Sequence, residues 1–399
     1  MRSVTEKTGP DSWSHFLALS LDRLRAGGLY RRLRLIDSPV APSVNIDGRP
    51  FLLFCSNDYL GLANHSRMKT VAAETALSWG TGSGASRLIS GNNSFYGGLE
   101  KAVAGFKGTE AALIFSSGYA TNVGVITSLV DRGDLILSDA LNHASIVDAC
   151  GLSKARVQVY PHGDIDALES LLDAAPASGK TLVVTDGVFS MTGDLAPLPE
   201  LDKICREYGA LLMVDDAHGT GVIGPKGGGT LDYFNMDGRG IVQMGTFSKA
   251  LGGLGGFVAG SSRLIDYLIN YARSLIYSTA LPPAVLASNR EGIRIIQTEP
   301  SHRERLSTLV NHMRLGLGRL GFQASPWPTP ILPIVIGDVE ETLSIAQHLW
   351  DKGLFVPAIR PPTVPRGESC LRISLSALHT PADLDRLLAA LEAHYKKGS

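Results

Sequence analysis

The feature that most constrains the fold is a series of short apolar runs that alternate with helical patterns. The runs occupy residues 111–115, 135–138, 181–185, 210–214 and 241–245. Runs that are apolar throughout are typical of parallel strands buried on both faces, and the helices between them supply the crossovers. We therefore predict an α/β fold with a mostly parallel sheet, whose ligand site lies at the carboxyl ends of the strands.

Three parts are expected along the chain. An amphipathic pattern over residues 11–36 predicts a helix within an N-terminal arm, residues 1–45. Residues 46–285 would form the large domain. After residue 285 the pattern changes to helices with short strands, which predicts a smaller C-terminal α+β domain over residues 286–399.

Composition excludes several classes of protein. The 37 basic and 38 acidic residues give a net charge of −1, so we expect no nucleic-acid partner. No stretch approaches the roughly 20 apolar residues of a membrane span, and the N-terminus lacks the apolar segment of a signal peptide. The 4 cysteines form no C-x-x-C motif, so we expect no metal site and a reduced, cytoplasmic chain.

The 44 glycines are more than a chain of this length ordinarily carries, and they cluster. The Gly/Ser-rich segment 80–91 is interpreted as a loop in a binding site, with a surface linker as the alternative. The run Gly227–Gly229 has no such explanation and is expected to be a surface turn.

Chemically active side chains follow two of the predicted strands. Asp215, Asp216 and His218 come after one, and Lys249 comes after the next, among small residues that let a flat group approach the backbone. A carboxylate and a lysine at neighbouring strand ends suggest pyridoxal 5′-phosphate (PLP). The segment 116–122, between a strand and a helix, would hold its phosphate.

These residues resemble the α-oxoamine synthases, PLP enzymes that condense an amino acid with an acyl-CoA. The resemblance runs from about residue 20 to residue 395. The segments that carry it lie at residues 56–62, 117–122, 142–145, 186–191, 214–221 and 246–252. It implies PLP-dependent transferase fold type I, with a mostly parallel, seven-stranded sheet, and a homodimer with shared active sites.

The resemblance also implies roles for individual residues around the cofactor. Lys249 would form the Schiff base and move the Cα proton of the amino acid. Asp215 would pair with the pyridinium nitrogen, and Asp216 is the second candidate for that role. His218 would hydrogen-bond the phenolic oxygen, with Ser190 near the same edge.

Further residues would hold the ring and the phosphate. His143 would stack on the ring face and serve as an acid or base. Thr246 would contact the phosphate, together with the backbone of Gly118 and Tyr119. Ser278 and Thr279 would complete the phosphate site of the partner chain, with a local turn as the alternative reading of this pair.

The amino-acid carboxylate needs a bidentate donor. Arg372 matches the arginine of the family, Asn57 would assist it, and Arg360 is a rival. Thr363 would lie beside the acyl substrate. Arg31 would meet the acyl group, with Arg32 or a solvated helix face as alternatives.

Two positions depart from the family pattern. Asp186 stands where Glu is common, and Thr192 stands where Asp is common. Both lie near the expected substrate and outside the core of the PLP site.

The segments Asp215–Gly221 and Arg360–Pro365 are particularly like the biotin-pathway member of the family, which joins a pimeloyl thioester on CoA or a carrier protein to L-alanine. Glycine acetyltransferase, aminolevulinate synthase and serine palmitoyltransferase remain alternatives. A non-catalytic partner subunit would lack Lys249. The alternative of a nicotinamide-binding oxidoreductase depends on the run Gly252–Gly256. This run lacks the G-x-G-x-x-G spacing of a dinucleotide-binding loop.

Overall fold

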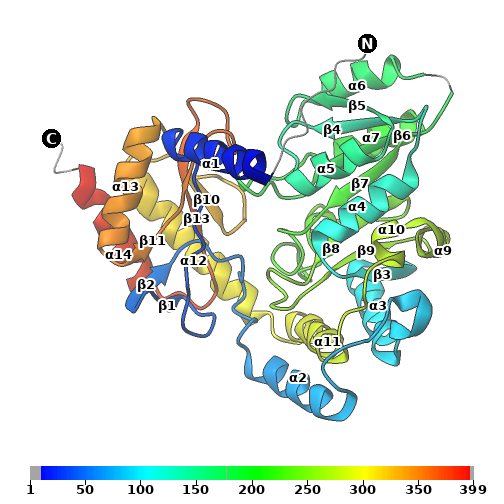
Figure 1. The fold of residues 1–399 in the computed structure, drawn as a ribbon, viewed down its shortest axis with the longest axis horizontal. Helices are drawn as coiled ribbons and strands as arrows, with labels where there is room; N and C mark the ends of the chain where they lie inside the picture. The colour runs from blue at the N-terminus through cyan, green and yellow to red at the C-terminus, as the bar shows by residue number, and fades with distance from the viewer. Residues whose placement is uncertain (1–9, 177, 396–399) are drawn as a thin grey trace.

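The computed structural model describes residues 10–176 and 178–395, which form two lobes lying side by side (Figure 1). The large lobe contains the central sheet with its helices. The small lobe is built mainly from the C-terminal part of the chain.

The large lobe is built on a seven-stranded sheet in the order β3-β9-β8-β7-β6-β4-β5. Only β9 runs against its neighbours, so the predicted mostly parallel α/β sheet is confirmed. The sequence patterns did not predict β5 or β9. The strands are β3 (Ala111–Phe115), β4 (Leu135–Asp139), β5 (Arg156–Tyr160), β6 (Thr181–Asp186), β7 (Leu211–Asp215), β8 (Ile241–Thr246) and β9 (Gly256–Gly260).

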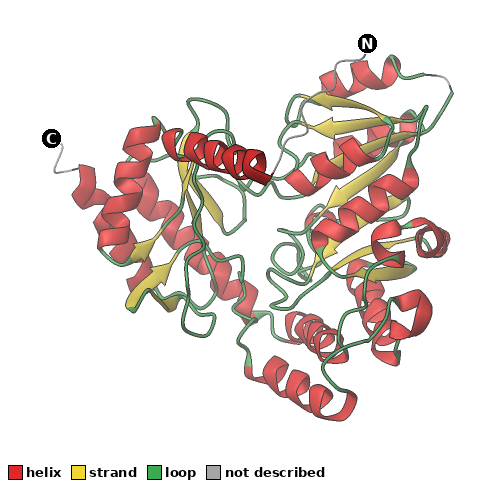
Figure 2. Cartoon of the chain, viewed as in Figure 1, coloured by secondary structure: helices red, strands yellow, loops and turns green. Residues whose placement is uncertain are grey.

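Helices cover both faces of this sheet, which is why its central strands are apolar throughout (Figure 2). The helices of this lobe are α2 (Ser66–Trp79), α3 (Ser94–Lys107), α4 (Gly118–Leu129), α5 (Ala144–Leu152), α6 (Ile165–Asp173), α7 (Leu198–Glu207), α8 (Thr230–Tyr233), α9 (Ser262–Tyr271), α10 (Arg273–Ile276) and α11 (Pro283–Thr298). Among them, α2 packs on α11. A π-helical turn, η1 (Arg87–Gly91), lies in the glycine-rich segment.

The small lobe contains two three-stranded sheets, β1-β2-β11 and β10-β13-β12. Strand β2 pairs with β11 in parallel, so residues 43–53 join the C-terminal part, although the expected boundary at residue 46 places β2 in the large domain. The elements are β1 (Ser43–Ile46), β2 (Arg49–Leu53), α12 (Ser301–Arg319), β10 (Ile331–Gly337), α13 (Val339–Asp351), β11 (Leu354–Phe355), β12 (Ala358–Ile359), β13 (Ser369–Ser374) and α14 (Pro381–Tyr395).

The N-terminal helix is shorter than predicted. It ends at Ala26 as α1 (Pro10–Ala26), and the chain over residues 27–36 is not helical. Gly27 and Gly28 follow the helix, and Gly28 has a φ of +63°, a conformation that side chains other than glycine disfavour. The predicted helix was too long because the amphipathic pattern continues beyond residue 26, although Gly27 and Gly28 end the helix there.

Two further properties concern the described residues alone. None of their helices is both long and apolar enough to cross a bilayer. The four cysteines, Cys55, Cys150, Cys205 and Cys370, are free thiols.

Candidate active site

A cavity of about 250 Å³ opens at the carboxyl ends of the parallel strands, where the fold predicted a ligand site. It gathers side chains from β6, β7 and β8 and from the loops that follow β3 and β4. Its lining residues are Ser117, Gly118, Tyr119, Asn122, His143, Ser145, Asp186, Asp215, Ala217, His218, Met244, Thr246, Ser248 and Lys249.

Asp215 is fixed in this cavity by the strand register and by two donors. It ends β7 directly opposite Asp186 of β6 and Met244 of β8. Asn122 donates to its Oδ2 at 2.7 Å, and the backbone N–H of Ala217 donates to its Oδ1 at 3.0 Å. The buried carboxylate therefore has one orientation, with lone pairs left for a further donor.

Asp216, the second candidate for the same role, is turned away from the cavity. Its Oδ2 pairs with Lys107 Nζ at 2.7 Å, and both side chains are completely buried. Thr230 donates to its other oxygen through both N–H and hydroxyl. The geometry thus leaves Asp215 as the carboxylate that can meet a ligand.

The Gly227–Gly229 run was expected to be a surface turn, and this prediction is wrong. The run is buried and lies against the Asp216–Lys107 ion pair. Lys107 Nζ donates to the carbonyl of Gly228 at 2.6 Å. A Cβ on Gly229 would lie 1.6 Å from Asp216 Oδ2, so the loop needs glycine to close over the buried carboxylate.

Lys249 follows β8 and borders the cavity. Burial lowers the pKa of its ammonium group, and Arg372 acts in the same direction, although the carboxyls of Asp215 and Asp186 oppose this. The amine is therefore more available in its neutral, nucleophilic form than an exposed lysine would be.

Asp186 is a cavity residue that was treated only as a departure from the family pattern. Burial raises its pKa well above the ordinary value, and the neighbouring Asp215 adds to this. Its Oδ2 is buried without a hydrogen-bond partner among the described residues. The signal that could have identified it was its place at the end of a buried strand next to β7.

His143 lies over the cavity at the start of α5. Its Nδ1 is 2.7 Å from the hydroxyl of Ser145 and accepts the N–H of the same residue at 3.2 Å. Ser145 also accepts a hydrogen bond from Asn122. Burial lowers the pKa of His143, although Asp215 acts against it, and the neutral ring can accept a proton.

His218 is joined to the loop after β2 through a tyrosine that the sequence analysis missed. Tyr59 is fully buried, and its hydroxyl lies 2.7 Å from His218 Nδ1 and 3.1 Å from Asn57 Oδ1. Burial lowers the pKa of His218 well below the usual value, with Lys249 and Arg372 adding to the effect. The neutral imidazole therefore has one N–H, whose position depends on the Tyr59 hydroxyl.

The other end of the cavity suits an anion. The first N–H groups of α4 have no partner within the helix, and the helix dipole favours negative charge there. A Cβ on Gly118 would lie 3.2 Å from Met244 Cε, so a larger residue would crowd this end. The hydroxyls of Thr246 and Ser248, 2.7 Å apart, border the same space.

Arg372 is buried beside the cavity and is held from two sides. Its Nε donates to the carbonyl of Ser190 at 2.5 Å, and Nη1 donates to the hydroxyl of Ser374 at 2.7 Å. Its rival Arg360 donates to the carbonyl of Gly28 and borders a separate cavity of about 600 Å³. Arg372 is therefore the arginine placed near Lys249 and His218.

Seven of the predicted site residues do not line this cavity in the single chain. Arg372 lies beside it, Asn57, Ser190 and Ser278 are half-buried, and Arg31, Thr363 and Thr279 are exposed. Thr279 forms an isolated β-bridge with Ser86, so the segment after α10 runs beside the glycine-rich segment 80–91. In a single chain, the hydroxyls of Ser278 and Thr279 therefore do not line the cavity.

Comparison with known proteins finds a family model and close relatives over most of the chain. The model described as aminotransferase class I and II matches residues 49–391. A protein of Geobacter sulfurreducens called 8-amino-7-oxononanoate synthase is 49% identical over 94% of this chain and 96% of its own length. A protein of Lysinibacillus sphaericus with the same name is 49% identical over 92% of this chain and 94% of its own length.

Solved structures agree with this fold. A serine palmitoyltransferase variant from S. paucimobilis, solved with a bound PLP–myriocin aldimine, superposes with a TM-score of 0.91 at 31% identity. The match covers 98% of this chain and 99% of that chain.

Proposed function

The chain belongs to the aminotransferase class I and II family, within its α-oxoamine synthases, and from this premise we propose that it makes 8-amino-7-oxononanoate for biotin biosynthesis. L-Alanine would condense with a pimeloyl thioester, with loss of carbon dioxide and release of CoA or a carrier protein. The observation that carries the proposal is the single cavity shared by Lys249, Asp215, His143 and His218, in a chain nearly half identical to the synthases that carry this name.

The donor set of the cavity fits PLP. The helix N-terminus with two hydroxyls would hold the phosphate, the fixed carboxylate of Asp215 would meet the pyridine nitrogen, and the amine of Lys249 borders the same cavity. When bound, the cofactor supplies an electron sink that stabilises negative charge at the amino-acid Cα.

Lys249 would hold the cofactor through its aldehyde carbon and, once displaced by alanine, would take the proton from Cα. Its lowered pKa favours both roles, because the neutral amine is the nucleophile and the base. His143 would cover the ring face, exclude water and exchange protons with the substrate.

Asp215 would hold the ring nitrogen in its protonated form, because its carboxylate cannot turn away from the donors Asn122 and Ala217. His218 would donate to the phenolic oxygen through Nε2 in the tautomer whose Nδ1 accepts the Tyr59 hydroxyl. When that hydroxyl donates to Asn57 Oδ1 instead, the ring hydrogen lies on Nδ1. Arg372 would pair with the carboxylate of alanine.

A homodimer would complete the site. The exposed apolar side chains of α1 include Trp13, Phe16 and Leu17, and a second copy of the chain would cover them. Ser278 and Thr279, outside their own cavity, would then reach the phosphate bound by the other copy. Asn57 would assist Arg372, and Arg31 and Thr363 would meet the acyl group.

A substrate panel tests the reaction. Purified enzyme with PLP is given alanine, glycine or serine with pimeloyl, acetyl, succinyl or palmitoyl thioesters, and thiol release is measured. Alanine with a pimeloyl thioester should be fastest, on CoA or on a carrier protein. A faster reaction of serine with palmitoyl-CoA would support the alternative of a serine palmitoyltransferase, the activity named for the structural relative.

The cofactor is tested by absorbance. The protein with PLP should absorb near roughly 420 nm, and Lys249→Ala should lose this band, whereas Lys180→Ala on the surface should keep it. A colourless wild-type protein would favour a non-catalytic partner subunit. The four free thiols are compatible with the cytoplasmic location that we propose for the enzyme.

A further inference from the structure

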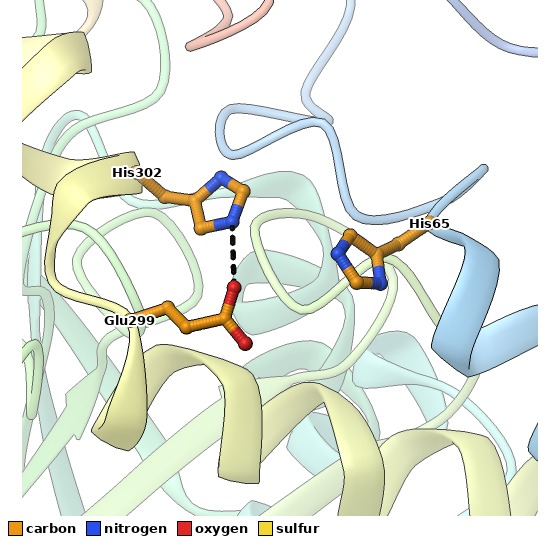
Figure 3. A group of neighbouring side chains, drawn as sticks. All are labelled: His65, Glu299 and His302. Carbon is orange, nitrogen blue, oxygen red and sulfur yellow. Dashed lines mark ion pairs between the residues drawn. The ribbon is translucent and has the colours of Figure 1, made fainter.

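His65, Glu299 and His302 come together away from the cavity described above (Figure 3). Their candidate ligand atoms all lie within 4.8 Å of one another. Glu299 Oε2 is 3.6 Å from His302 Nε2, and the ring centroids of His65 and His302 are 6.1 Å apart. In Figure 3 the ring of His302 lies above the carboxylate of Glu299, and the ring of His65 lies to its right.

We propose that these three residues form a site for a divalent transition-metal ion, with Zn²⁺ as the best match. Two imidazoles and one carboxylate are a ligand set that suits Zn²⁺, with a water molecule as the fourth ligand. Bonds of about 2.0–2.1 Å place tetrahedral ligand atoms about 3.4 Å apart. Glu299 and His302 are already near this separation, so the remaining adjustment is a small movement of His65.

The carboxylate of Glu299 is oriented as a metal ligand requires. Arg67 donates to its Oε1, which leaves Oε2 facing His302. Arg67 is itself held by Glu291 at 2.6 Å, and Arg294 holds the other oxygen of Glu291. Hydrogen bonds of this kind to the second oxygen of a ligating carboxylate fix its direction and limit its other partners.

His65 has no other evident task in the fold. It stands at the N-cap of α2, yet its side chain makes no capping hydrogen bond. Its Nδ1 is buried without a partner among the residues the structure describes.

The position of the cluster suggests what the metal would do. The chain passes from the small to the large lobe between β2 and α2, and it returns between α11 and α12. His65 lies at the end of the first crossing, and Glu299 and His302 flank the second. The ion would tie the two crossings together and brace the loop that carries Asn57 and Tyr59.

Titration of the PLP-loaded, chelator-treated protein with Zn²⁺ alone tests this proposal. Calorimetry should show one ion per chain, and His65→Ala, His302→Ala and Glu299→Gln should each weaken binding about tenfold or more. His312→Ala is the matched control, because His312 lies on the same helix α12 and pairs with Asp385 at 2.7 Å. It should bind Zn²⁺ as the wild type does.

Glu299→Gln keeps an acceptor for Arg67, so its loss of binding cannot be assigned to unfolding. A melting temperature that rises with Zn²⁺ in the wild type, and stays constant in His65→Ala, would further support the site. No binding at about 100 μM Zn²⁺, or equal binding by the double variant His65→Ala/His302→Ala, would overturn the proposal.

Discussion

The hydroxyl of Tyr59 lies 2.7 Å from Nδ1 of His218, and both side chains are buried. They come from different parts of the chain, since Tyr59 lies on the crossing from the small to the large lobe, between β2 and α2, and His218 follows β7 of the large lobe. The contact therefore couples the orientation and tautomer of His218 to the position of this crossing.

Removal of this hydroxyl should lower turnover without unfolding the protein. Tyr59→Phe removes the hydroxyl that contacts both His218 and Asn57. The lost hydrogen bond to the buried imidazole is worth about 1 kcal/mol, so kcat should fall about fivefold to tenfold. Tyr160→Phe is the matched control, because Tyr160 is also buried but its hydroxyl has no hydrogen-bond partner among the described residues. Equal kcat values for the two variants in steady-state assays would contradict the role of Tyr59.

Substitution of the two adjacent aspartates should affect different properties, activity for Asp215 and stability for Asp216. Asp215→Asn removes the charge that we propose to meet the cofactor, so it should reduce kcat by about 100-fold or more, with a smaller change in melting temperature. Asp216→Asn leaves Lys107 buried without its counter-ion and should reduce the free energy of unfolding by about 3–5 kcal/mol. Activity assays and urea unfolding of both variants measure the two effects.

This prediction has a clear negative outcome. If Asp216→Asn lost the 420 nm band and Asp215→Asn kept it, the assignment of the two carboxylates would have to be exchanged.

His162 should stabilise the protein in a way that depends on pH. Burial disfavours its charged form, but hydrogen bonds to Asp139 and Asp194 outweigh this and raise its pKa to about 10. The folded state therefore keeps a proton that the unfolded state loses near pH 6.5. The stabilisation is complete below pH 6.5 and declines as the pH rises toward 10.

His162→Gln measures this contribution. Urea unfolding at pH 6 should show the variant to be less stable than the wild type by about 1–3 kcal/mol, and the difference should shrink at pH 8 and nearly vanish at pH 10. His312→Gln removes a contact with a single acidic partner, so it should reduce the free energy of unfolding at pH 6 by less. A difference for His162→Gln that is constant from pH 6 to pH 10 would rule out titration as its cause.

The sequence predicted much of the large lobe because the buried strands there are continuous apolar runs. It also predicted that Lys249, Asp215 and His218 lie at the strand ends, where all three line the cavity, because they follow strands that the pattern marks clearly; their roles stay predictions. The apolar pattern did not predict strand β5, because β5 is an edge strand with exposed residues.

Contacts between distant segments were the hardest to predict. Tyr59 meets His218, and Asn122 meets Asp215, only after the chain has folded, so neither pair has a local signal. The cluster of His65, Glu299 and His302 also forms only on folding. No known spacing of metal ligands in a sequence would have predicted that His65 lies near Glu299 and His302.

Gly229 gives the sharpest test of how the loop that covers Asp216 is built. It has a φ of +101°, and a Cβ there would lie 1.6 Å from Asp216 Oδ2, so Gly229→Ala suffers both backbone strain and a clash with a buried carboxylate. Gly133→Ala separates the two effects, because Gly133 has a similar φ of +94° but nothing within 4 Å of its Cβ position.

Gly133→Ala should cost about 1–2 kcal/mol of unfolding free energy, whereas Gly229→Ala should cost about 4 kcal/mol or more, since it also displaces the Asp216–Lys107 pair. Addition of Asp216→Ala to Gly229→Ala should then cause a smaller further loss than Asp216→Ala causes alone, because the first change has already disturbed the pair. Strictly additive losses in urea unfolding would show that Gly229 and Asp216 act independently, and that the glycine is not there to close the loop over the carboxylate.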